Sequence, residues 1–481
     1  MPAPSSPPFP PRWARIVDLI CILLVLLAIT IAVSGGLRLR GAGLRLALTS
    51  PYRVLAWAIV VGVLRHFAAP QAPIYRHLPA RLAAAWRTAA VRTAIGAVAG
   101  TRLPILFVGY LAVFMLGYGE GGAPWKLFEN EFFNLQIRWD TGWYFGIALD
   151  GYSYVPNRPL DQQNIVFFPA FPLAMRVAGR LLGGTAPAYI LGGTLVAIGA
   201  FFGALVYLYH FAWDMLADDN RASYSVWVIA TFPFALFYSA VYTESLFLLG
   251  AIGTFYHFRR CEYWRAGAWG LLAGLTRPNG CLLSVPLAIL ALAPWIPEWL
   301  AGGSAAGKRP AVERGARLSA LAAAAMPGVC VLLYSAFIWR LTGNPLQWAA
   351  GHIAWGRHYE GLSVLVTSRY EYLSHGGLYA YTSQLPDDLL NALGAVFVLA
   401  AVWPVARRLG LAYAVFIVIN ILPPLAAGGL LSAGRFSSVL FPAFVWFASV
   451  VPERQWPAWL VSFMAVQTFN AMLFYTWRPL Y

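Results

Sequence analysis

The chain has 481 residues, of which 60% are hydrophobic and only 11% are charged. Soluble domains carry about 25% charged residues, so this chain has too few polar side chains to cover a soluble surface, and a bilayer is the expected environment. The formal net charge of +15 would suit a nucleic-acid-binding protein. However, the basic residues lie mostly in short segments between apolar runs, as the positive-inside rule describes for cytoplasmic loops, so we expect no nucleic acid partner.

The first 92 residues predict an extension in front of the core. Residues 1–15 are rich in proline and are expected to be disordered. Apolar runs at 16–33 and at about 54–63 with its flanks predict two membrane helices. The segment that follows is expected to be cytoplasmic because of its basic residues, which are Arg65, Arg76, Arg81, Arg87 and Arg92. The extension then covers 16–92, and the core covers 93–481.

Apolar runs throughout the core predict further membrane helices. One ends near Tyr118, and the others lie at about 187–210, 222–240, 244–258, 318–340, 389–404, 411–430, 436–451 and 457–475. The run at 266–294 is interrupted by Thr276-Arg277-Pro278-Asn279-Gly280, which predicts two half-helices with this motif at their apex. The pattern is that of an all-α polytopic membrane protein with about 11–13 membrane helices. Long extracytoplasmic loops are expected at about 119–165 and 341–388.

The first outer loop contains a carboxylate among aromatic residues, Asp140 in Arg138-Trp139-Asp140-Thr141-Gly142-Trp143-Tyr144. A carboxylate at the edge of a membrane bundle can accept a proton from a sugar hydroxyl, so Asp140 is a candidate general base. The alternative is that Asp140 caps a helix that begins at Thr141, and general capping preferences favour this alternative.

Four further charged residues are candidates for binding. Arg277 lies inside an apolar segment, where an ionisable residue is a functional candidate by default, and its planar fork suits phosphate oxygens. Its alternative role is a structural pair with an intramembrane carboxylate. Glu244 can orient an acceptor hydroxyl or hold an arginine, or it can simply stabilise a helix start. Arg357 and Arg435 are further phosphate candidates, with interfacial snorkelling as the alternative.

The sequence carries no motif for a metal or a cofactor. There is no P-loop, no Gly-x-Gly-x-x-Gly turn between a strand and a helix, and no His-Glu-x-x-His. The seven histidines are scattered, and none of the four cysteines forms a Cys-x-x-Cys pair. We therefore expect no cofactor.

Five motifs occur in the order in which the PIG-V mannosyltransferase family has them. They are Arg138-Trp139-Asp140, Ile147-Ala148…Gly151-Tyr152, Phe167-Phe168-Pro169-x-Phe171-Pro172, Tyr242-x-Glu244-Ser245-Leu246-Phe247 and Thr276-Arg277-x-Asn279-Gly280. The block Gly343-x-Pro345-Leu346…Trp355-Gly356-Arg357 resembles bacterial members of the family. The chain thus resembles the second-step mannosyltransferases of GPI-anchor synthesis and their bacterial relatives, over residues 95 to 450.

The resemblance implies a C-type glycosyltransferase fold and inverting transfer of a sugar, with mannose as the family expectation, from a polyprenyl or dolichyl phosphate. Asp140 would be the catalytic base, on the extracytoplasmic face of a bacterial plasma membrane. Eukaryotic members carry histidine two or three residues after the aspartate, where this chain has Gly142 and Trp143, and Pro278 replaces a common serine. These departures leave the acceptor open: a glycolipid or another extracytoplasmic glycan. The need for a partner subunit stays open as well.

A mechanism joins the residues to this implied chemistry. The donor phosphate meets Arg277, Arg357 or Arg435, Asp140 deprotonates the acceptor, and the lipid tail lies among membrane lipids. The expected substrate-binding residues are Arg138, Trp139, Trp143, Tyr144, Glu244, Asn279, His352 and Trp355.

Two other classes of function compete with a transferase. A sugar or lipid transporter, or a flippase, would also use an intramembrane arginine at a broken helix. Transporters often contain internal repeats, and the two outer loops share no pattern. A structural subunit that holds a partner enzyme is the second alternative, and the carboxylate in the outer loop argues against it.

Overall fold

The computed structural model describes residues 11–480, apart from 35–36, 42–43, 77–82, 293–313 and the single positions 49, 70, 72, 74, 121, 124, 157 and 159. Of residues 1–15, which the sequence predicts to be disordered, 1–10 lie outside this part of the chain, as does Arg81, whereas residues 12–15 belong to the first helix. The described part is almost entirely helical. Its strands form one antiparallel hairpin, β1 (Leu37–Gly41) with β2 (Leu44–Leu48).

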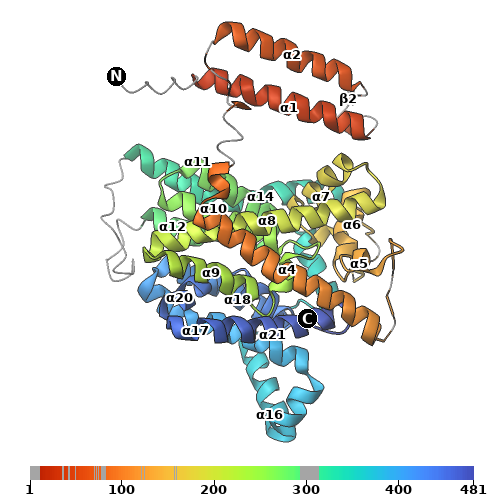
Figure 1. The fold of residues 1–481 in the computed structure, drawn as a ribbon. Helices are drawn as coiled ribbons and strands as arrows, with labels where there is room; N and C mark the ends of the chain where they lie inside the picture. The colour runs from red at the N-terminus through yellow and green to blue at the C-terminus, as the bar shows by residue number, and fades with distance from the viewer. Residues whose placement is uncertain are drawn as a thin grey trace.

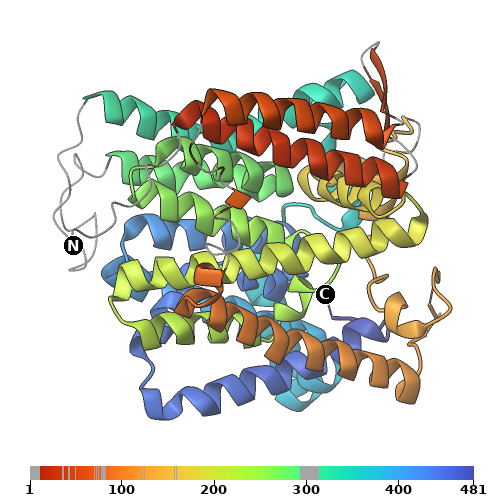
Figure 2. The same ribbon diagram turned by 45° about the horizontal axis from the view of Figure 1, so that its top comes forward.

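Seven helices of the described part are long and apolar enough to cross a membrane. They are α1 (Arg12–Ser34), α4 (Ala89–Leu116), α8 (Ala186–Leu216), α14 (Arg314–Thr342), α17 (Pro386–Arg408), α18 (Leu411–Gly428) and α21 (Trp456–Tyr475). Figures 1 and 2 show the long helices running in roughly one direction, as spanning helices do. The prediction of a polytopic helical membrane protein is confirmed. A count of 11–13 would require shorter helices to cross as well.

The two N-terminal helices form a hairpin that lies outside the main bundle (Figure 1). Helix α1 packs along α2 (Pro51–Ala68), and a buried ion pair joins Asp18 Oδ1 to Arg65 Nε at 2.6 Å. Arg65 also donates hydrogen bonds to the carbonyl oxygens of Ala69 and Gln71. Arg65 lies within α2 rather than in the segment predicted to follow this helix, and Asp18 neutralises its charge inside the hairpin.

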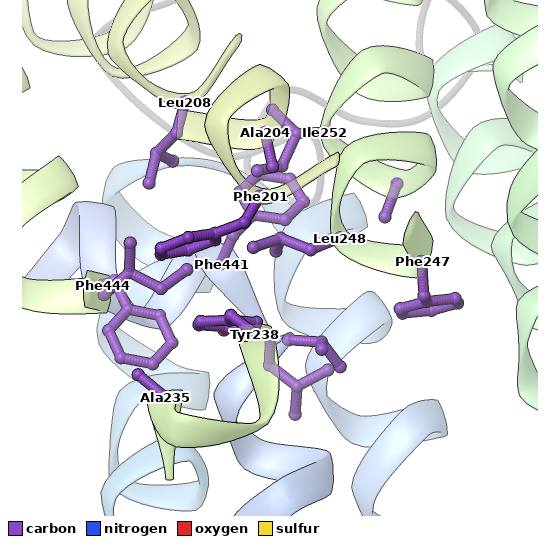
Figure 3. Close-up of a cluster of buried hydrophobic side chains, with 14 of the residues drawn as sticks. Phe201, Ala204, Leu208, Ala235, Tyr238, Phe247, Leu248, Ile252, Phe441 and Phe444 are labelled. Carbon is purple, nitrogen blue, oxygen red and sulfur yellow. The ribbon is translucent and has the colours of Figure 1, made fainter. Parts of the chain in front are cut away.

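The core of the bundle is packed with aromatic and small side chains. Figure 3 shows Phe201 of α8 beside Tyr238, and their rings stack with centroids 4.5 Å apart. Helix α10 (Glu244–Arg259) crosses α11 (Tyr263–Thr276) at Gly250, where an added Cβ would lie 3.0 Å from the backbone of Ala273. Small residues at such crossings bring membrane helices into close contact.

The predicted break in the 266–294 run is present. Helix α11 ends at Thr276, Arg277 is extended (φ −149°, ψ 149°), and a 3-10 turn (Pro278–Leu283) leads into α12 (Ser284–Leu292). A proline disfavours helical geometry in the residue before it, so Pro278 accounts for the break at Arg277.

The helices differ from the sequence expectation in two places. The expected helix at 222–240 ends early: α9 covers Asp219–Thr231, and Pro233 separates it from a 3-10 turn, Ala235–Tyr238. The segment predicted as the second outer loop is largely helical, with α15 (Gln347–Ala350), a 3-10 turn (Gly351–Trp355) and α16 (Leu362–Gln384), which is kinked at Gly377.

The remaining short helices carry or support the candidate site. In the segment predicted as the first outer loop they are α5 (Glu131–Asn134), α6 (Thr141–Leu149) and a 3-10 turn (Asn164–Val166), followed by α7 (Ala170–Leu181). Near the end of the chain they are α19 (Ala433–Ser438), α20 (Phe441–Val450) and a 3-10 turn (Glu453–Gln455).

Candidate active site

Three arginines from distant segments surround one aromatic ring. The guanidinium carbons of Arg277, Arg357 and Arg435 lie 5.2, 5.4 and 5.7 Å from the ring centroid of Phe436. Arg277 comes from the helix break, Arg357 follows the turn that ends at Trp355, and Arg435 stands on α19. The three side chains that the sequence proposed as phosphate ligands are therefore neighbours.

Two carboxylates link two of these arginines, Arg435 and Arg277, into one ion-pair chain. Arg435 Nη1 donates to Asp140 Oδ2 at 3.1 Å, and its Nε lies 3.2 Å from Glu244 Oε1. The same Glu244 oxygen accepts a hydrogen bond from Arg277 Nη2 at 3.0 Å. The order along the chain of contacts is Asp140, Arg435, Glu244 and Arg277.

The charges of this cluster do not balance. Three guanidinium groups face two carboxylates, so the five residues Asp140, Glu244, Arg277, Arg357 and Arg435 carry a formal surplus of one positive charge. The Nη1 atoms of Arg277 and Arg357 are buried and have no hydrogen-bond partner within the described part of the chain. Unsatisfied buried donors are costly, so the cluster is suited to bind an anion.

The side chain of Asp140 does not cap helix α6. It makes no capping hydrogen bond, and its backbone N–H donates instead to Tyr242 Oη at 3.0 Å. The capping interpretation that the sequence favoured is therefore wrong. The Asp140 side chain is 21% exposed, whereas that of Glu244 is fully buried. Asp140 can therefore meet a substrate, while Glu244 is placed to hold the arginines.

Three residues that the sequence proposed as substrate contacts are engaged elsewhere. Arg138 is buried, and its guanidinium donates to the carbonyl oxygens of Asn134, Ile137 and Tyr475. Tyr144 packs into the core against Phe167 and Phe171. Asn279 Nδ2 donates to Asn420 Oδ1 at 2.8 Å. These side chains shape the site by holding backbone and helices together.

An aromatic group connects the two segments predicted as outer loops. The Trp143 ring stacks on Phe167 at 5.8 Å, and the edge of Trp355 meets Trp143 at 5.6 Å. Both tryptophans are half-buried, which leaves ring surface that a sugar could contact. His352, in the same turn as Trp355, packs beside Trp348. Burial lowers the pKa of His352 to about 4, with the charge of Arg357 contributing, so the ring is neutral near pH 7.

Sequence reasoning passed over two residues of this site. Tyr242 binds the backbone of Asp140, and its ring lies 5.4 Å from the guanidinium carbon of Arg435. Phe436 supplies the ring that all three arginines share. Tyr242 opens the motif that contains Glu244, and Phe436 directly follows Arg435. Their position next to charged candidates could therefore have identified them in the sequence.

Comparison with known proteins covers the first part of this site. A family model described as "Mannosyltransferase (PIG-V)" matches residues 125–292. This segment matches the PIG-V family. The chain is also similar to GPI alpha-1,6-mannosyltransferase 2 of Cricetulus griseus, with 29% identity over 154 residues. That alignment covers 31% of this chain and 30% of the relative, so the similarity spans less than a third of either protein. Asp140, Glu244 and Arg277 lie inside the PIG-V match, whereas Arg357 and Arg435 lie beyond it.

Proposed function

We propose that this chain is a PIG-V-type membrane mannosyltransferase with the C-type glycosyltransferase fold. It would transfer mannose from a polyprenyl-phosphate donor to an acceptor hydroxyl on the extracytoplasmic face of its membrane. The observation that carries the proposal is the cluster of three arginines and two carboxylates around Phe436, with Asp140 at its exposed end. The PIG-V match over 125–292 supports the same chemistry.

The charge of the cluster suits a lipid-linked phosphodiester. Such a donor carries one negative charge, which equals the formal surplus of the cluster. When the sugar leaves, the lipid phosphate becomes a monoester and gains a second negative charge. Positioned guanidinium groups therefore stabilise the transition state more than the ground state. Arg277 and Arg357 each offer a buried N–H for this phosphate.

The contact between Arg435 and Asp140 supports a role for Asp140 as base. Arg435 Nη1 donates to Asp140 Oδ2 at 3.1 Å and so fixes this carboxylate at the exposed end of the cluster. Asp140 would accept the proton of the acceptor hydroxyl while that oxygen attacks the anomeric carbon. The bond between the anomeric carbon and the oxygen of the lipid phosphate breaks on the side opposite to the attack. The configuration of the anomeric carbon therefore inverts.

The test is turnover in liposomes with polyprenyl-phosphate-mannose and a panel of glycolipid acceptors. Loss of a general base costs about 10²–10⁴-fold in rate, so Asp140→Asn should lose that much activity with an unchanged elution profile. Activity like that of the wild type in this variant would refute the assignment of the base. Absence of released polyprenyl phosphate with every acceptor would refute the transferase, and donor movement across the same liposomes would then favour a flippase.

A further inference from the structure

Residues with strained backbone conformations lie next to Asp140 and in two segments near it. Among the described residues, five that are not glycine have a positive φ, and three of them lie at this site: Trp139, Ser432 and Trp477. Trp139 precedes Asp140, Ser432 precedes α19, and Trp477 follows α21. Such conformations cost about 1–3 kcal/mol each and persist only where the surroundings over-determine them.

The segment Thr476–Leu480, which follows α21, reaches the loop of Asp140. The Trp477 ring contacts the Trp139 ring with centroids 4.9 Å apart. It also lies 5.8 Å from the guanidinium carbon of Arg138, whose Nε donates to the carbonyl oxygen of Tyr475 at 2.8 Å. The two residues before Asp140 are therefore held from the end of α21 and the start of this segment.

The same segment reaches Arg435 through one buried amide. Asn391 of α17 is 2% exposed, and its Nδ2 donates to the carbonyl oxygen of Leu480 at 2.8 Å. Its Oδ1 accepts the backbone N–H of Gly434 at 2.9 Å, and Gly434 directly precedes Arg435. The backbone at Gly434 is tightly packed, because a Cβ at this position would lie 2.2 Å from the Phe234 ring.

We propose that segment 476–480 is a positioning clamp that sets the 3.1 Å contact between Asp140 and Arg435, with Trp477 and Asn391 as its two arms. Both act through neighbouring residues rather than on substrate. A displacement of a catalytic group by about 1 Å can lower the rate about 100-fold, so residues that fix its position can have a large effect on kcat. The inference rests on the proposed transferase function, and both arms lie outside the PIG-V match.

The test begins with Asn391→Leu, which keeps the branched shape of the side chain and removes both hydrogen bonds of this arm, together with a third to the carbonyl oxygen of Asp387. The matched control is Gln467→Met, which removes a fully buried amide whose partners are Arg102, Ala230 and Phe232. We expect Asn391→Leu to lower kcat about 10–100-fold. Gln467→Met, at a similar melting temperature, should change kcat less than about threefold. In an Arg435→Ala background, Asn391→Leu should add less than about threefold, because its effect passes through Arg435.

The second arm provides an independent variant. Trp477→Ala should lower kcat, and Trp477→Phe, which retains a ring against Trp139, should restore most of it. Equal losses in Asn391→Leu and Gln467→Met, or a full further loss in the Arg435→Ala background, would overturn the proposal.

Hydrogen exchange separates this proposal from the transferase itself. Amides of 433–438 should exchange faster in Asn391→Leu than in Gln467→Met, whether or not turnover is detected. Unchanged exchange would overturn the clamp even in an active enzyme. If the wild type transfers no sugar while exchange responds as expected, the transferase has failed and the positioning of Arg435 stands.

Discussion

The strongest electrostatic prediction concerns Glu244, which is fully buried and holds two arginines. Its Oε1 accepts from Arg277 Nη2 at 3.0 Å and lies 3.2 Å from Arg435 Nε. Glu244→Gln keeps an oxygen for both contacts but removes the charge. The formal surplus of the five-residue cluster then rises from one positive charge to two, in surroundings where water cannot compensate it.

Breaking a buried ion pair from one side costs about 3–5 kcal/mol, because the partner charge stays buried. Since glutamine preserves the hydrogen-bonding geometry, we expect the lower end, about 3 kcal/mol, in the free energy of unfolding. Adding Arg277→Met removes one positive charge and returns the surplus to one. The double variant carries no more buried charge than the wild type, so it should regain most of the stability and remain inactive.

The assay is denaturant unfolding in mixed micelles, with turnover measured in parallel. The control is Glu131→Gln, which breaks an ion pair with Lys126 where solvent screens both charges. That variant should unfold like the wild type. The reasoning is refuted if Glu244→Gln is as stable as Glu131→Gln, or if Arg277→Met destabilises the Glu244→Gln protein further.

Three further predictions concern the same cluster and the N-terminal hairpin. Arg435→Lys should lower kcat about 10²–10³-fold, because one ammonium cannot replace the separate Nη1 and Nε contacts; turnover at wild-type rates would contradict this. Gly434→Ala should cost about 1–3 kcal/mol and most activity, because its Cβ meets the Phe234 ring at 2.2 Å; unfolding and turnover together test it. Asp18→Asn should cost about 3 kcal/mol by leaving Arg65 unpaired in the hairpin, yet transfer by the folded protein should persist; a proportional loss of kcat would show that the hairpin serves the site.

Much of the local architecture followed from residue order. A run of about 20 apolar residues predicts a spanning helix, because a helix of that length crosses the hydrocarbon core of a bilayer. The break at Arg277 was equally local, since Pro278 acts on the residue before it. The end of α9 at Thr231 shows the limit of this approach, because an apolar run continues past Pro233 while the helix does not.

The roles of charged residues depended on partners far away in the chain. Asp140 and Arg435 are 295 positions apart, and only the fold could bring Arg435 of α19 to the start of α6, where Asp140 binds it rather than capping its own helix. Arg138 is adjacent to Asp140 in a motif, yet its guanidinium is held by the carbonyl oxygens around Tyr475. The motifs thus pointed to the charged residues that were proposed for the site. Contacts between distant segments determined which of these side chains are exposed enough to meet a substrate. The physical reason is that a buried charge must find a counter-charge or a dipole, and its nearest candidates come from whichever segments the fold brings beside it.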